Sequence, residues 1–282
     1  MNRPDDIRDR IANIREIESI VLTLRALAVA HQHEARAHLA PIRAHEVSVA
    51  MALSTALAAA QATAPHPKDV PGLVIVIGSA QGFSGVFGDR IADAALAEAT
   101  RGADIVAVGG RTLGALGERR VTPVWSTETA THAQEVPSLA SRLSDVLFER
   151  LAKTAGEPVA LLFADPDATD LSLIRRSLFP FDFNRFPAMT EDLPLTSLSA
   201  GALVSDLVEE YVFTELCEAL MLGYAAENGA RAAAMSRAQT NVKRIAADLQ
   251  AEFQRSRQEQ MTTEIIELST PAMPRHSALS LP

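Results

Sequence analysis

A glycine-rich turn is the first place in this sequence where residue types and spacing could support chemistry. The apolar run Leu73–Ile77 is typical of a strand buried on both faces, and the turn Gly78–Gly85 follows it. Turns of this kind can hold nucleotide phosphates on backbone N–H groups. However, its glycines at 78, 82 and 85 do not fit the fingerprint G-x-G-x-x-G, and no P-loop lysine follows them. We interpret the turn as a strand-to-helix connection that needs backbone freedom and close packing.

Candidate nucleophiles and metal ligands lack the partners that catalysis would need. Ser84 fails the hydrolase pattern G-x-S-x-G, because Val86 replaces the last glycine. His31, His38 and His45 recur every seven residues on one helix face, but seven residues rise about 10 Å, too far for one ion. We expect this stripe to be solvated or to face a partner.

Two further reactive residue types are expected to be structural. Asp165 and Asp167 follow an apolar run and should cap a turn. Cys217 stands in a helical pattern and should be a packing residue. As the sole cysteine, it excludes a disulfide framework and fits a reducing compartment. We therefore expect no catalytic residue, no cofactor and no metal.

A basic cluster near the C-terminus allows two interpretations. Arg255 and Arg257 stand beside Gln258 in a long helical pattern. The cluster could be a solvated helix face. It could also be a contact patch, because arginine can clamp a carboxylate or carbonyl groups of a partner with two parallel hydrogen bonds.

The two ends of the chain must form long helices that need a partner. Residues 225–268 contain no proline and one glycine, and a seam of small and apolar residues recurs at alternating three- and four-residue spacing. The seam comprises Met235, Ala238, Val242, Ile245, Leu249 and Phe253. Only Pro41 interrupts a matching pattern from Asp5 to about Ala62. Its seam comprises Ile7, Ile11, Ile14, Ile17, Val21, Leu24 and Ala28. Matched lengths predict one antiparallel coiled coil made from the two ends.

Composition limits the classes of partner. The net charge of −9 should repel nucleic acid and anionic membrane surfaces. We expect no secretory signal, since charged residues open the chain. Residues 47–64 carry no charge over eighteen positions, but Ala, Ser, Thr and Gln dominate them. We expect a packed alanine-rich helix there rather than a membrane span.

The middle of the chain alternates strand and helix patterns. Strands are predicted at 73–77, 103–108, around 121–125 and at 158–164, with helices up to Thr100 and over 135–153. This order favours a parallel or mostly parallel sheet. The predicted fold is α/β plus a long antiparallel coiled coil, in which the terminal helices flank an inserted Rossmann-like domain. The predicted domains are 1–64, the N-terminal coiled-coil helix; 72–195, the α/β domain with an irregular connection over 180–194; 203–270, the C-terminal coiled-coil helix; and 271–282, a tail.

Three blocks of the sequence resemble those of a known family. They are Ile7–Ile11 with Leu24–Ala28, the turn Gly78–Gly88, and a C-terminal block of Ala230–Met235, Gln254–Gln258, Met261–Glu264 and Glu267. In these blocks the chain resembles the gamma subunit of the F-type ATP synthase, over essentially its whole length. The C-terminal block is long and specific, whereas the glycine turn alone would be weak.

Several positions depart from the family's pattern. Leu24 to Ala26 replace a stretch rich in methionine and lysine, Ser84 replaces a cysteine, and Gln254 replaces an asparagine. Ala80 and Gln81 stand where relatives have Asp-Arg, and Pro271 and Pro274 should end the last helix near Ser269. These departures suggest a divergent branch, such as an alternate F-type ATPase beside a main one.

The resemblance implies a central rotor shaft without catalytic residues of its own, in a complex that transports protons or sodium ions. It implies contacts with the alpha and beta subunits of the hexamer, the epsilon subunit and the c-subunit ring, at one copy per complex. It also implies a peripheral place on the cytoplasmic face of the bacterial inner membrane, without membrane insertion or nucleic-acid binding. The residues that would contact the alpha/beta hexamer, by motif position, are Arg25, Arg255, Arg257, Gln258, Thr262 and Glu264.

Three alternatives remain open at this stage. The chain could be a free-standing coiled-coil adaptor. It could be an enzyme whose α/β domain binds a nucleotide at the turn after Ile77. It could also be a gamma-like shaft of an ion-pumping ATPase rather than of a synthase.

Overall fold

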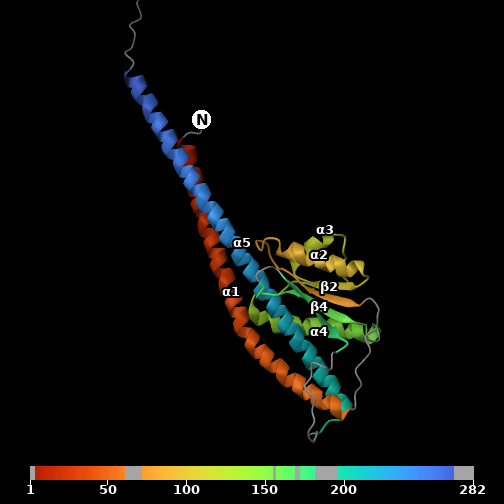
Figure 1. Ribbon diagram of the computed structural model, residues 1–282. Helices are drawn as coiled ribbons and strands as arrows, with labels where there is room; N and C mark the ends of the chain where they lie inside the picture. The colour runs from red at the N-terminus through yellow and green to blue at the C-terminus, as the bar shows by residue number, and fades with distance from the viewer. Residues whose placement is uncertain (1–3, 61–71, 155–156, 169–171, 182–195, 270–282) are drawn as a thin grey trace, which may run out of the picture. The chain divides into compact units, whose positions relative to one another are not determined.

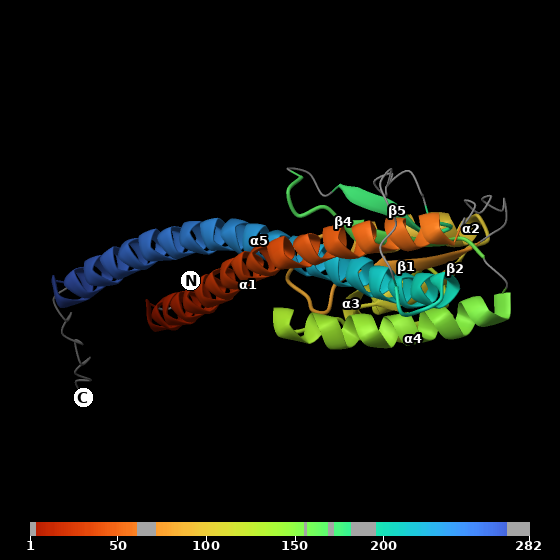
Figure 2. The same cartoon turned by 90° about the horizontal axis from the view of Figure 1, so that it is seen from below.

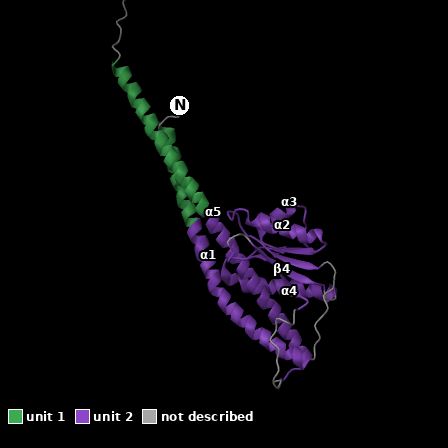
Figure 3. Ribbon diagram, viewed as in Figure 1, with its two compact units in different colours: residues 1–23, 236–282 green, residues 24–235 purple. Residues whose placement is uncertain are grey.

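Two long helices flank a five-stranded α/β domain along the chain (Figure 1). The helices are α1 (Pro4–Ala59) and α5 (Ala200–Ser269). The computed structural model describes residues 4–60, 72–154, 157–168, 172–181 and 196–269. The chain forms two compact units whose limits fall inside both long helices (Figure 3): unit 1 contains residues 1–23 and 236–282, and unit 2 contains residues 24–235.

Unit 1 is an antiparallel helix pair held by an apolar seam. Ile7, Ile11 and Leu249 are buried together, and Ile14 and Phe253 pack against them. On α5 the buried and half-buried positions of this unit include 242, 246, 249 and 253. Their four-three-four spacing is the heptad period of a two-stranded coiled coil. The predicted pairing of the two chain ends is therefore confirmed within this unit.

Two predicted seam positions are wrong. Ile17 is 44 % exposed and Ile245 is 37 % exposed. The seam passes instead through the half-buried Glu18 and Ala246, one residue further along each helix. A heptad repeat alternates steps of three and four residues, so an isoleucine next to a true seam position makes the register ambiguous in the sequence.

Unit 2 is built on one sheet with the strand order β3-β2-β1-β4-β5. The strands are β1 (Leu73–Ile77), β2 (Asp104–Val108), β3 (Trp125–Thr127), β4 (Val159–Ala164) and β5 (Leu173–Phe179). Neighbouring strands are parallel except for β5, which runs antiparallel to β4. The mostly parallel sheet predicted from the sequence is confirmed.

Alternate residues of the central strands enter two different cores. Ile75 packs on the side of α4 (Val136–Thr154) and α5, and Val74 packs on the side of α2 (Phe87–Thr100) and α3 (Gly110–Glu118). The views in Figures 1 and 2 show these helices on opposite faces of the sheet. The first core also takes in Ala35 and Leu39 of α1, so that α5 is covered by both α1 and the sheet.

A cluster of ion pairs joins three elements of unit 2. Arg176 of β5 donates to Glu215 at 2.9 Å and to Glu218 at 2.5 Å, and Arg43 of α1 donates to Glu218 at 2.7 Å. Burial alone would raise the pKa of Glu218, but the hydrogen bonds from Arg176 and Arg43 lower it below its usual value. The buried Glu215 also accepts a hydrogen bond from Tyr211 at 2.7 Å. The cluster fixes α1 and β5 against α5.

Three elements are not apparent from the sequence, namely α3, β5 and the short 3₁₀ helix η1 (Ala133–Glu135), and one strand lies away from its predicted place. Helix α3 was overlooked because four glycines, at 109, 110, 114 and 117, obscure its pattern. Strand β5 was overlooked because Arg175 and Arg176 interrupt its apolar character, as an edge strand permits. The third strand begins at Trp125 rather than near Val121, which is buried in the connection after α3.

Two of the predicted segments lie largely outside the residues that the structure describes. The irregular connection predicted for 180–194 lies mostly within residues 182–195, outside the described residues, as does the tail 271–282. The described part of α5 ends at Ser269, where Pro271 and Pro274 predict a helix end. Among the helices of the described residues, none contains an apolar stretch that could span a bilayer.

Replacing Leu249 by alanine should loosen unit 1, whereas Ile245→Ala should not. Leu249 lies in the seam, so its truncation should lower the opening free energy of the helix pair by about 2 kcal/mol or more. Ile245 is exposed, and its truncation should change that free energy by less than about 0.5 kcal/mol. Hydrogen exchange of residues 5–20 in the full chain measures both values. Equal effects of the two variants would contradict the assigned register.

Candidate partner-contact surface and closed crevice

The last turns of α5 carry five of the six residues predicted to contact a partner. All five are exposed in unit 1. Arg255, Gln258 and Thr262 line one shallow hollow together with Glu259 and Thr263. This grouping follows from their spacing of three and four residues, which places them on one helix face.

The other predicted contact residues lie elsewhere. Arg257 and Glu264 are seven residues apart and share the face of α5 that is opposite to the hollow. Glu264 there accepts a hydrogen bond from Gln260 at 2.9 Å. Arg25 is exposed on α1 and belongs to unit 2. The end of α5 thus presents two chemically different faces.

Apolar residues around the same end of α5 were missed by the sequence analysis. Met261, Ile265, Ile266 and Leu268 are all more than half exposed, and Leu268 reaches 88 %. Monomeric proteins rarely leave such a group of large apolar side chains in water, so it indicates a binding surface. These four residues could have been recognised in the sequence as a separate apolar group, because they lie beyond Phe253, the last residue of the apolar seam.

A second region of interest is the crevice where the strand order reverses. In open α/β sheets, ligands bind beyond the carboxyl ends of strands at such a switch point. Here it lies between β1 and β4, and the glycine turn 78–85 follows β1. A Cβ atom on Gly78 would lie 2.1 Å from Thr112 Oγ1, and Gly85 has a φ of 65°. The interpretation of this turn as a close-packed connection that needs glycine is confirmed.

At this switch point the turn after β1 holds a carboxylate of the chain itself. Glu227 Oε1 of α5 accepts hydrogen bonds from the backbone N–H groups of Ala80 at 3.2 Å and Gln81 at 3.3 Å. Arg231 donates to the same oxygen at 2.6 Å. The turn therefore does hold an anion on its N–H groups, but the anion is part of the protein. The sequence signal for it was an acidic residue at the end of the apolar run 219–226.

The histidine stripe on α1 faces other parts of unit 2. The ring of His31 packs 5.9 Å from that of His132 and 6.0 Å from that of Tyr224. His45 Nε2 lies 2.7 Å from Glu210 Oε1, and its side chain is 53 % exposed. The expectation of a solvated or partner-facing stripe is wrong for His31 and holds only in part for His45. In the described part of the chain, no group of three or more His, Cys, Asp or Glu residues is placed to hold a metal ion.

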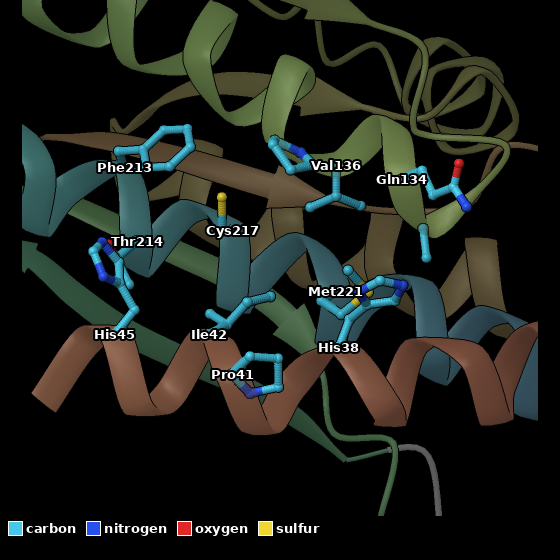
Figure 4. A pocket seen from close by; sticks show the side chains of 12 residues that line it. His38, Pro41, Ile42, His45, Gln134, Val136, Phe213, Thr214, Cys217 and Met221 are labelled. Atoms are coloured by element: carbon cyan, nitrogen blue, oxygen red, sulfur yellow. The ribbon is translucent and has the colours of Figure 1, made fainter.

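Two of these histidines border an apolar cavity of about 310 Å³ between α1, α5 and the start of α4 (Figure 4). Cys217 lines it and belongs to the main core, which confirms its predicted packing role. Burial, helped by the nearby charge of Glu210, raises the pKa of the Cys217 thiol to about 12.

The carboxylates after β4 behave as predicted. Asp165 Oδ1 accepts a hydrogen bond from the backbone N–H of Asp167 at 2.9 Å, which closes a turn. Arg36 of α1 donates to Asp167 at 2.9 Å.

The fold and the exposed surfaces define a class of protein. Its two terminal helices pair and flank an inserted α/β domain, and the exposed charged and apolar residues at the end of α5 are those of a subunit that binds other proteins. The family model described as ATP synthase matches residues 4–273. The ATP synthase gamma chain of Anaeromyxobacter dehalogenans is 27 % identical over 279 residues, which cover 93 % of this chain and 96 % of that one. The gamma chain of Fuscovulum blasticum is 24 % identical over 287 residues, with the same shares covered.

Solved structures share the fold. A chain from the rotor of the Euglena gracilis mitochondrial ATP synthase has a TM-score of 0.63 at 14 % identity, and the match covers 92 % of this chain and 98 % of that one. A chain from the central stalk and c-ring of the Tetrahymena thermophila mitochondrial ATP synthase has a TM-score of 0.58 at 16 % identity, covering 78 % and 99 %. The chain belongs to the gamma subunits of the ATP synthase family.

Cys217 should react slowly with thiol reagents in the folded chain. At about pH 8, a thiol with a pKa of about 12 has roughly 10³-fold less thiolate than an unperturbed one. Alkylation measured by mass spectrometry should therefore be at least that much slower in the native chain than in concentrated urea. The exposed variant Glu118→Cys, in a Cys217→Ser background, should react quickly in both states. Similar rates for native and unfolded Cys217 would refute its burial.

Proposed function

We propose that this chain is the central shaft of a membrane-bound F-type ATP synthase or ATPase, and that it couples proton or sodium-ion flow to ATP synthesis or hydrolysis in an alpha/beta hexamer. The observation that carries the proposal is the end of α5. It is exposed on all sides and combines charged with large apolar side chains. A helix end of this kind fits inside a partner that surrounds it, since burial of the apolar residues would then be favourable.

Coupling needs a shaft that differs from one side to the other. A rotor shifts the conformational equilibrium of a surrounding subunit only through contacts that differ between its states. Arg255, Gln258 and Thr262 on one face and Arg257 with Glu264 on the opposite face provide such a difference. Rotation would present each catalytic subunit with the two faces in turn. The nucleotide chemistry would take place in the partners.

We infer the remaining contacts from the family resemblance. The α/β domain would meet the epsilon subunit and the c-subunit ring, with one copy of the chain per complex. Arg25 on α1 would add a further contact with the hexamer. The complex would place the chain at the cytoplasmic face of a bacterial inner membrane, as a peripheral subunit.

Purification of a tagged chain from membranes of its own cells tests this function. The alpha and beta subunits should accompany it in fixed proportion, and detergent should release the ion-transporting sector with them. Recovery of the chain without these subunits would contradict the proposal and favour a free-standing coiled-coil adaptor or an enzyme built on the α/β domain.

Arg257→Ala combined with Gln258→Ala should lower coupled turnover while the complex still assembles. Loss of a charge-assisted contact on a partner should slow coupled ATP turnover roughly tenfold or more. Both side chains are exposed in the isolated chain, so its folding should be unchanged.

The matched control is Arg244→Ala with Gln250→Ala, which removes the same two residue types from exposed positions earlier in α5. ATP hydrolysis and ATP-driven ion transport in membrane vesicles give the measurement. Wild-type coupling in the Arg257/Gln258 variant, or an equal loss in the control, would remove these residues from the contact set.

A further inference from the structure

One buried carboxylate connects α5 with the sheet at the crevice. We call this connection the joint. It consists of Glu227 and Arg231 of α5 and of turn residues 79–82. Glu227 is 2 % exposed and is held by two backbone N–H groups of the turn and by the guanidinium of Arg231. Arg231 also donates to Gly82 O at 3.5 Å, so both members of the ion pair contact the same turn.

The neighbours of the joint keep its two sides fixed. On the helix side, Arg231 donates to Asn228 Oδ1 at 2.8 Å, and the buried Asn228 donates to Tyr224 O at 2.9 Å. On the sheet side, the N–H of Ser79 donates to Thr112 Oγ1 at 2.8 Å. A buried carboxylate is tolerated only where its hydrogen bonds and opposite charge are supplied. The turn and Arg231 supply both.

Most other contacts between residues 219–226 of α5 and the sheet are apolar, whereas earlier along the helix the Arg176 ion pairs with Glu215 and Glu218 hold α5 to β5. The side chain of Ile77 lies so close to Gly223 that a Cβ there would be 2.5 Å from Ile77 Cγ2. Apolar burial is non-directional, so it resists separation of two surfaces more than sliding between them. Hydrogen bonds depend on angle and distance, so they resist sliding as well. The joint is therefore a directional attachment of α5 at the glycine turn, in addition to the Arg176 ion pairs at β5.

We propose that Glu227 is a torque-bearing positioning residue: its carboxylate takes the place of a ligand anion at the switch point and fastens the α/β domain to α5. The proposal rests on the proposed function as a shaft. A shaft that carries load must not slip where its helix meets the domain docked on the membrane sector. The crevice that binds ligands in related sheets serves here as a mechanical connection.

The test compares three variants in the assembled complex. Glu227→Ala removes the anion, and Glu227→Gln keeps the size and an acceptor oxygen but removes the charge. The control Glu98→Ala removes another buried carboxylate of the same domain, one paired with Arg101 at 3.0 Å and with Arg175 at 3.3 Å, away from the joint.

Two readouts are taken for each variant. The first is hydrogen exchange of the turn peptide that contains Ala80 and Gln81. The second is the number of ions transported per ATP hydrolysed in vesicles. Glu227→Ala should speed exchange of the turn about tenfold or more and reduce ion transport per ATP by about half or more. Glu227→Gln should fall between this variant and the wild type.

Added acetate gives a readout that general destabilisation would not produce. In Glu227→Ala, acetate at high concentration should enter the vacated site and restore both slow exchange and part of the coupling, with no effect on Glu98→Ala. Faster exchange without a loss of coupling would overturn the load-bearing role. So would an equal coupling loss in Glu98→Ala, or unchanged exchange in Glu227→Ala.

Failure of the shaft function itself would look different. In that case the wild-type chain would not purify with alpha and beta subunits, while exchange and acetate rescue in the full chain would still report on the joint.

Discussion

The burial of α5 between residues 211 and 228 is the constraint on which the rest of the structure depends. All of these residues except Phe213 and Glu218 are buried, because α1 covers one side of the helix and the sheet covers the other. A helix that is apolar all round cannot remain in water, so this stretch requires both neighbours. It explains why a sheet and two helices distant in sequence fold as one unit, and why the few polar residues in the stretch, such as Glu215 and Glu227, are paired.

Further along α5 the requirement changes. In unit 1 the helix needs only one apolar seam, and the first turns of α1 provide the partner. Beyond Phe253 even the seam ends, yet Ile265, Ile266 and Leu268 continue to be apolar. The chain itself leaves these side chains in water, which is why we propose the end of α5 as the contact surface for other subunits.

Much of this fold could be predicted from the sequence, because long helices and buried parallel strands have strong periodic signals. The helix pair and the central strands follow from apolar spacing alone. The exact seam did not, since Ile17 and Ile245 stand one residue away from the true positions. Helix α3 and strand β5 were hidden by glycines and arginines that only tertiary contacts explain. The contact residues 255–264 came from motif resemblance and stay predictions. The role of Glu227 could not be predicted from the sequence, because its partners Ala80 and Gln81 are far away along the chain and only the fold brings them together.

The central claim is that this chain turns as one shaft inside its partners. Direct observation of rotation tests it best. A fluorescent probe is attached to Glu118→Cys, an exposed position of the α/β domain, in a Cys217→Ser background, and the complex is immobilised through its hexamer. If the chain is a rotor shaft, the probe should rotate stepwise in one direction, and the rotation should depend on ATP. Steady ATP hydrolysis with a stationary probe would contradict it.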